Sequence, residues 1–388
     1  MLTAAPWDEP DELTAVRGMV QRLLGRHLPL DRALELDRTG SFDRATWEAL
    51  GAAGLLGLGA DEDAGGSGGT VRDAVAVTEE LARVLPSLAV DYVLSGMAMR
   101  MLTDTGSDRA RRWLPDIASG RRICSFGLSE PGVGTDLLNL ATTAREVDGQ
   151  WVVNGRKTWI SLASEADVVF TLARTDPAEP AHKSRGLSLI AVPTDQDGVT
   201  IRRVHLAGMR AAITCEVFLD DASAPLDNLV GTRGRAMSIL GRTLDVERVM
   251  AAAISLGIGR AALDLHVAYA GERTAFGRAI GAFQAVAHPA ADSICELSAA
   301  RALVDSTVRM IGRGEPALAH SAMAKLNAAE ATARIVDRGM RAMGAMGLAD
   351  ESAMQMYFRD ARLQLFSPVS NEMVRNVLTE SMGLPRSY

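Results

Sequence analysis

The chain has 388 residues, of which 47% are hydrophobic and 23% are charged, and its formal net charge is −7. This is the composition of a globular protein that is too long for a single hydrophobic core, so two or three packed regions are expected. The acidic balance disfavours nucleic acid as a partner, and the three widely spaced cysteines, Cys124, Cys215 and Cys295, predict neither a disulfide framework nor a metal site.

Two further features concern location and codon usage. Residues 1–12 are acidic and contain proline, which is not the pattern of a signal peptide. The longest apolar run, Val249 to Ile258, is too short to cross a bilayer, so we expect a cytoplasmic protein with no membrane partner. Only Lys157, Lys183 and Lys325 among the 41 basic residues are lysines, which we interpret as GC-rich codon usage.

Hydrophobic periodicity divides the chain into three parts. Apolar residues recur at helical spacing from about Leu13 to Gly120, which predicts a helical N-terminal domain over residues 1–121. Short β-branched and aromatic runs separated by Asp-Gly, Asn-Gly and proline turns then predict a compact β domain over 122–229. Long alanine-rich helices fill 230–388. Helices, strands and helices segregated in this way predict an α+β fold.

Two distant segments have the residues of a nucleotide-binding site. Phe126 to Asp136 is dense in turns: its turn-forming residues Pro131, Gly132 and Gly134 lie among the hydroxyls of Ser129 and Thr135, so bare N–H groups can approach a ligand. Glu272 to Gly277, followed by Phe283-Gln284, is predicted to open a helix, and its Arg273 is a cation that suits a pyrophosphate.

Together these segments resemble those of the acyl-CoA dehydrogenase flavoproteins, and the resemblance runs over nearly the whole chain. It implies FAD held between the subunits of a homo-oligomer, usually a dimer of dimers. It also implies a helical N-terminal domain, a β-barrel-like middle domain and a C-terminal four-helix bundle.

The resemblance assigns cofactor contacts within one subunit. The segment from Phe126 to Gly134 meets the flavin ring through residues such as Leu128 and Ser129, and Thr135 meets the pyrophosphate and the substrate. In Lys157-Thr-Trp-Ile-Ser161, Trp159 packs on the flavin while the Ser161 hydroxyl approaches it. In a regular strand Trp159 and Ser161 share a face.

Other contacts implied by the resemblance come from a neighbouring subunit or from the C-terminal region. The neighbouring subunit supplies Arg273, which reaches the pyrophosphate. It also supplies Phe276 and Gln284 to the same cofactor. A further family segment has a glutamine where this chain has Arg341, although its Gly344 matches. Ser370 is the last cofactor contact that the resemblance implies.

The usual catalytic base of the family is missing. A glutamate nine residues after the arginine of Arg-Asp-Ala normally removes the proton α to the thioester, but that position here is Pro368, between Ser367 and Val369. Enzymes resembling isovaleryl-CoA dehydrogenase carry the base within Leu-Asp-x-Glu-Arg instead. The chain has this motif as Leu244 to Arg248, which makes Glu247 the expected base, in an apolar setting that raises its pKa.

Alternatives to Glu247 remain open. It could be a solvated or ion-paired helix residue, and Glu372, four residues after Pro368, is another carboxylate near the vacant position. Arg248 matches an arginine that lines the acyl or pantetheine channel of relatives, or it forms a structural ion pair. Ser367 and Pro368 would then face the substrate.

The resemblance therefore predicts FAD-dependent dehydrogenation of an acyl thioester to the enoyl thioester, Glu247 taking the proton and flavin N5 the hydride. The acyl group is carried by coenzyme A or by an acyl-carrier protein, and the electrons pass to an electron-transfer flavoprotein or to oxygen. Two other classes stay open: a flavin-dependent monooxygenase or nitroalkane-oxidase-like enzyme on the same fold, and a non-catalytic flavoprotein.

Overall fold

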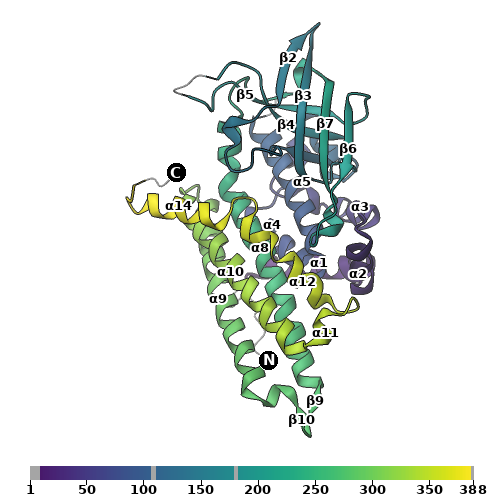
Figure 1. Cartoon of the computed structure of the whole chain (residues 1–388), viewed down its shortest axis with the longest axis vertical. Coiled ribbons are helices and arrows are strands. Elements are labelled where there is room, and N and C mark those ends of the chain that lie inside the picture. Colours follow the sequence, from purple (N-terminus) through teal and green to yellow (C-terminus); the bar gives the residue numbers. More distant parts are fainter. Residues whose placement is uncertain (1–8, 106–110, 179–181, 386–388) are drawn as a thin grey trace.

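The computed structural model describes residues 9–105, 111–178 and 182–385, and three regions follow one another along the chain (Figure 1). Helices come first, a β-sheet follows at one end of the molecule, and long helices complete the chain (Figure 1). This is the α+β arrangement that the sequence predicts. The N-terminal helices are α1 (Asp11–His27), α2 (Leu30–Thr39), α3 (Arg44–Ala52), α4 (Val71–Val84), α5 (Pro86–Thr105) and α7 (Leu114–Ala118).

The middle region is one twisted sheet. Its strands are β1 (Cys124–Gly127), β2 (Thr143–Val147), β3 (Gln150–Ser161), β4 (Val168–Arg174), β5 (Leu187–Pro193), β6 (Val199–Arg203), β7 (Thr214–Pro225) and β8 (Leu229–Val230). Their order is β6-β7-β3-β2-β4-β5-β8, with β1 beside β4. The end strands β6 and β8 are not paired with each other in the described sheet, whereas β5 and β7 contact each other across the domain. The sheet thus folds over without closing, so it is barrel-like only in shape.

The C-terminal region is built on three long helices, α8 (Ala236–Glu272), α9 (Gln284–Gly312) and α10 (Leu318–Met343). Shorter helices pack against them: α11 (Ala345–Leu348), α12 (Ala353–Asp360), α13 (Leu363–Phe366) and α14 (Asn371–Ser381). Among the described residues the predicted four-helix bundle therefore has three long members, and α12, which contacts α8 and α10, completes it.

Helix α8 connects the regions. It contacts α4 and α5 of the N-terminal region as well as α9 and α10, and Trp47, Leu81 and Val249 belong to one continuous core. Residues Thr243–Glu272 are long and apolar enough to cross a membrane, but 83% of the most apolar window is buried inside the protein. We therefore interpret α8 as a core helix. It is much longer than the apolar run that the sequence shows.

A small hairpin separates α8 from α9. It consists of β9 (Thr274–Ala275) and β10 (Arg278–Ala279), and it lies at the end of the molecule farthest from the sheet (Figure 1). The aromatic side chain at its turn, Phe276, is 94% exposed and has a positive φ of 52°. Its own chain therefore leaves most of this large apolar side chain uncovered.

Candidate active site

The turn-rich loop after β1 is fixed to β3 by a buried ion pair. The Lys157 ammonium lies 2.9 Å from the Glu130 carboxylate and also donates to the carbonyl oxygen of Leu128 at 3.1 Å. Glu130 accepts hydrogen bonds from the backbone N–H groups of Ala141 and Thr142, at 2.7 and 2.9 Å. The loop is thus held at both ends. Between them Gly134 and Thr135 are exposed, while Phe126, Leu128 and Ser129 are half-buried.

Trp159 lies at an irregularity in β3. The register with β7 shifts between Lys157 and Ile160, and Trp159 has a φ of 61°, a left-handed conformation that is uncommon for a bulky residue. The regular-strand geometry assumed for Trp159 and Ser161 therefore does not hold. The Trp159 side chain is 61% exposed, which excludes packing in the core of its own chain. Ser161 is anchored through its carbonyl oxygen, which accepts from the Ser125 hydroxyl at 2.8 Å.

The predicted phosphate-side residues stand apart from this strand. Arg273, Phe276 and Gln284 are exposed around the β9–β10 hairpin, at the opposite end of the molecule from the sheet (Figure 1). One chain therefore does not bring Arg273 together with Trp159. Phe276 contacts Phe283 edge-on, with ring centroids 6.1 Å apart, and the Arg278 guanidinium lies 4.2 Å from the centroid of Phe283. The hairpin is a preformed projecting element.

The last turn of α10 carries two other predicted residues. Arg341 is exposed and forms an ion pair with Asp337 on the same helix, at 3.2 Å. Gly344 ends the helix with a φ of 58°, and a β-carbon there would meet no atom within 4 Å. Both are therefore accessible at the surface of the chain.

Glu247 lies on α8 in a largely buried position. Burial raises its pKa to about 7, although the charge of neighbouring Arg248 opposes the shift. In the described part of the chain the carboxylate accepts no hydrogen bond and forms no ion pair. The residue nevertheless keeps some accessible surface. The ion-paired alternative is therefore excluded within the described residues.

Arg248 is more deeply buried than Glu247, with 4% of its surface exposed. Its nearest carboxylate is Asp245, at 3.5 Å, and its Nε has no hydrogen-bond partner among the described residues. Asp245 in turn accepts from the Ser321 hydroxyl at 2.8 Å. This guanidinium is only partly satisfied by its own chain, so it has donor capacity left for a ligand.

The segment that contains Pro368 is held against α10, which packs on α8, by a lysine that sequence reasoning missed. Lys325 is fully buried, and its ammonium donates to the carbonyl oxygen of Val369 at 2.8 Å and to the Asn371 side chain at 2.6 Å. Burial lowers the pKa of Lys325 to about 8, and the charge of nearby Arg248 acts in the same direction. The short helix α13, which directly precedes this segment, also contacts α8, the helix of Glu247.

The other residues of this segment are less buried. Ser367 is half-buried and Pro368 is exposed. Ser370 caps α14, since its hydroxyl accepts from the Met373 N–H at 3.3 Å. Glu372, in the first turn of α14, is exposed, and hydrogen bonds from its own backbone N–H and from Ser370 lower its pKa. That carboxylate is a weaker base than Glu247.

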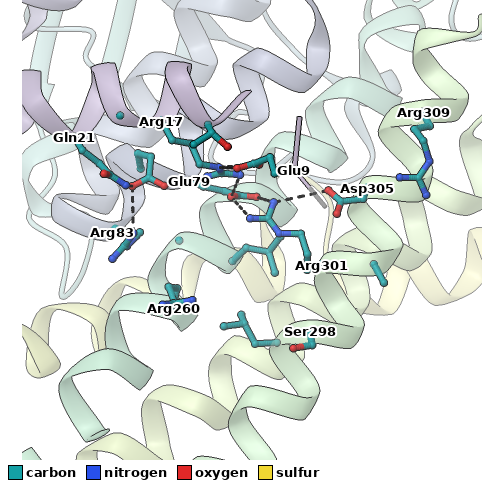
Figure 2. Close-up of a pocket in the computed structure, with 17 residues that line it drawn as sticks. Glu9, Arg17, Gln21, Glu79, Arg83, Arg260, Ser298, Arg301, Asp305 and Arg309 are labelled. Atoms are coloured by element: carbon teal, nitrogen blue, oxygen red, sulfur yellow. Dashed lines mark hydrogen bonds and ion pairs between the residues drawn. The ribbon is translucent and has the colours of Figure 1, made fainter. Parts of the chain in front are cut away.

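The most voluminous cavity that we describe lies elsewhere. It occupies about 720 Å³ between α1, α4, α8 and α9, and Figure 2 shows its charged walls. Arg17 contacts Glu79 at 2.7 Å and Glu80 at 3.0 Å, and Arg301 meets the other side of Glu79. Because these charges neutralise one another, we interpret the cluster as an ion-pair network that joins the N-terminal helices to α9.

Comparisons with known proteins cover the whole chain. Family profiles described as acyl-CoA dehydrogenase N-terminal, middle and C-terminal domains match residues 10–121, 125–222 and 234–383. Acyl-CoA dehydrogenase FadE12 of Mycobacterium tuberculosis is 33% identical over the full length of both chains. Mitochondrial isovaleryl-CoA dehydrogenase of Pongo abelii is 31% identical over 95% of this chain and 88% of its own length.

A solved structure agrees with these relatives. Butyryl-CoA dehydrogenase of Megasphaera elsdenii superimposes with a TM-score of 0.92 at 25% identity, over 97% of this chain and 100% of that one. The chain therefore belongs to the acyl-CoA dehydrogenase family and is an FAD-dependent oxidoreductase.

Proposed function

We propose that this protein dehydrogenates an acyl thioester and that Glu247 removes the proton α to the thioester carbonyl. The observation that carries the proposal is the state of this carboxylate, which is surrounded by protein, free of any described ion pair, and has a pKa raised to about 7. A general base works best when its pKa lies near the operating pH. FAD, when bound, supplies the acceptor for the hydride that leaves the β-carbon.

Exposed aromatic surface supports the residues proposed to hold FAD. Trp159 and Phe276 are 61% and 94% exposed, so each offers a flat apolar face that its own chain leaves uncovered. The Lys157–Glu130 pair fixes the backbone of the loop that would meet the ring. We propose that one subunit contributes Phe126, Leu128, Ser129, Gly134, Thr135, Trp159 and Ser161, and that Arg273, Phe276, Gln284, Arg341, Gly344 and Ser370 complete the cofactor sites of the oligomer.

Side chains around Glu247 support a substrate site next to it. Arg248 keeps an unpaired Nε beside this carboxylate, and Lys325 fixes the turn that follows Pro368. We propose that Arg248, Ser367, Pro368 and Thr135 line the channel for the acyl thioester. The positive charge of Arg248 would also favour the ionised form of Glu247 once a substrate excludes water.

The carrier, the acceptor and the assembly form part of the same proposal. The family supports acyl-CoA as the substrate and an electron-transfer flavoprotein as the acceptor. An acyl-carrier protein and oxygen are the other options, which the experiment below separates. Because the hairpin of Arg273 lies far from Trp159 within one chain, we propose a cytoplasmic homo-oligomer in which each hairpin serves a neighbour, with a dimer of dimers as the assembly.

The test is anaerobic mixing of the purified holoenzyme with a panel of acyl-CoA and acyl-carrier-protein thioesters, with bleaching of the flavin absorbance as the readout. We expect at least one thioester to bleach the flavin, and Glu247→Gln to slow bleaching by about a thousandfold or more while the flavin stays bound. Glu372→Gln is the matched control and should bleach at the normal rate.

The outcomes separate the alternatives. Bleaching that survives Glu247→Gln but is lost in Glu372→Gln would move the base to α14. If no thioester bleaches the flavin, the dehydrogenase proposal fails, and the monooxygenase, nitroalkane-oxidase-like and non-catalytic alternatives take its place.

A further inference from the structure

A small cavity lies beside Glu247, between α4, α5 and α8. Its volume is about 30 Å³, which is space for one or two water molecules. Thr243 and Met250 contribute to its wall one helical turn before and one turn after Glu247, and Val246 directly precedes this residue. The cavity is therefore next to the proposed base, where the part of an acyl group beyond the reacting carbons would extend.

The walls of this cavity are mostly apolar. They include Leu58, Val93, Met97, Val246 and Met250. Such a wall and so small a volume suit a short substituent better than a long acyl chain.

One charged side chain, Arg100 of α5, interrupts the apolar wall. Arg100 is half-buried, and a β-carbon at Gly59 would lie 3.6 Å from its Nη2, so the guanidinium rests on a bare glycine of the cavity wall. The φ of Gly59 is +85°, a conformation that disfavours a larger residue at this position. The guanidinium therefore lies next to a residue whose backbone conformation favours glycine.

Arg100 has no counter-ion. It makes no hydrogen bond and no ion pair within the part of the chain that the structure describes. By contrast, Arg17 and Arg301 in the charged cavity of Figure 2 each meet a carboxylate. A partly desolvated guanidinium against an apolar wall is unfavourable unless an anion meets it, and a carboxylate matches its planar fork.

We infer that Arg100 binds a carboxylate carried by the acyl group, so that the substrate is a thioester of a short dicarboxylic acid. This inference rests on the proposed function for the placement of the thioester beside Glu247. A terminal methyl group would leave the guanidinium unpaired, whereas a terminal carboxylate would form a charge-assisted, bidentate contact. Arg100 is therefore a specificity-determining residue that takes no part in proton removal.

Binding of unreactive analogues tests the inference without turnover. Two S-alkyl thioether analogues of coenzyme A, alike except that one ends in a carboxylate and the other in a methyl group, are titrated into the holoenzyme by calorimetry. We expect the carboxylated analogue to bind at least about tenfold more tightly. Arg100→Met should lower the affinity for the carboxylated analogue by about 10- to 100-fold and leave the affinity for the methyl analogue within about twofold of the wild-type value.

Two controls accompany the titration. Arg100→Lys keeps the charge and should retain part of the preference, because a point charge replaces the bidentate fork. Arg145→Met removes an exposed arginine of β2 and should change neither affinity. Flavin content and melting temperature confirm that each variant is folded. If Arg100→Met does not fold, the inference is still tested by the wild-type preference for the carboxylated analogue and by the affinities of Arg100→Lys.

Two results would overturn the inference. The first is equal or weaker binding of the carboxylated analogue by the wild type. The second is an equal loss of affinity for both analogues in Arg100→Met. The arginine would then hold a phosphate of coenzyme A, which both analogues share. Since neither analogue reacts, an Arg100-dependent preference for the carboxylate stands even if no thioester bleaches the flavin.

Discussion

The Lys157 ammonium lies 2.9 Å from the Glu130 carboxylate, and the exposed fractions of the two side chains are 0% and 6%. Burial lowers the pKa of Lys157 to about 8, although the charge of Glu130 opposes this shift. For Glu130 burial acts to raise the pKa, but hydrogen bonds from Thr142 and Ala141 and the charge of Lys157 lower it below its usual value. Both groups are therefore ionised at neutral pH, and each is the other's counter-ion.

Replacing this lysine should weaken both the fold and cofactor binding. Lys157→Met leaves the Glu130 carboxylate buried without its cation, and breaking such a pair costs about 3–5 kcal/mol. The loop that the pair fixes also loses its anchor at Leu128. We expect a lower urea midpoint at pH 7 and a lower ratio of flavin to protein absorbance after gel filtration.

Lys183→Met is the matched control, since this third lysine is exposed. It should leave the urea midpoint and the flavin content unchanged. A Lys157→Met enzyme with full flavin content and wild-type stability would show that the pair does not position the loop.

Activity should depend on the ionisation of Glu247. Because a base must be deprotonated to accept a proton, kcat/KM should rise as the pH passes through about 7 and then level off. Measurement of kcat/KM between pH 5.5 and 9 with a reactive thioester checks this. Glu247→Asp should keep a rising limb at a lower plateau. A flat profile for the wild type from pH 6 to 8 would contradict the assignment of Glu247 as the base.

Stability should change with pH in the opposite direction. The pKa of Glu247 is raised in the folded chain, so the native state binds the proton more tightly than the unfolded state does. Its contribution to stability is complete below its unfolded pKa, near 4.5, and is lost as the pH rises through about 7. The glutamine of Glu247→Gln does not titrate. The free energy of unfolding of this variant, relative to that of the wild type, should therefore rise by about 2 kcal/mol between pH 5 and pH 8, after allowance for partial solvent access.

Urea unfolding of both proteins at the two pH values gives this difference. Exposed Glu351→Gln serves as the control and should show no such change. A Glu247→Gln variant whose advantage is the same at pH 5 and pH 8 would mean that the wild-type carboxyl has an ordinary pKa.

Local patterns in the sequence predicted some features well. Helical periodicity and the switch to β-branched runs are patterns among residues close in sequence. They predicted the order of helices, strands and helices. Glu247 was predicted as the base because Leu244 to Arg248 resembles the motif of isovaleryl-CoA dehydrogenase and an apolar run follows it, and the expected rise of its pKa agrees with the structure. The first prediction required only local patterns, whereas the second also required the family resemblance.

Features that depend on tertiary contacts were missed. Lys157 meets Glu130 across 27 positions and Lys325 meets Val369 across 44, separations that no local pattern encodes. One signal was available, since two of the only three lysines in an arginine-rich chain are the two buried ones. Interpreting the scarce lysines as codon usage hid it. The bulge at Trp159 was also missed, because strand periodicity assumes a regular backbone.

The distance between the hairpin and the sheet leads to a prediction about the assembly. Arg273 and Phe276 are exposed in the chain, so Arg273→Ala should change its stability by less than about 0.5 kcal/mol. If the hairpin serves a neighbouring subunit, the same substitution should nevertheless lower the flavin content. Trp159→Ala should also lower the flavin content, because Trp159 would belong to the other subunit at the same shared site.

Mixed oligomers distinguish a shared site from a site within one chain. When Arg273→Ala and Trp159→Ala chains carry different tags and are purified together, one site of each mixed pair receives both defects and the other receives none. Flavin content and activity should therefore recover to about half of the wild-type values, as the two-fold symmetry of such a pair requires. Trp159→Ala mixed with Ser161→Ala is the control, since every site then has one defect and nothing recovers. Mixed oligomers of Arg273→Ala and Trp159→Ala that stay as inactive as their parents would place both residues in the site of a single chain, which the separation of the hairpin from the sheet opposes.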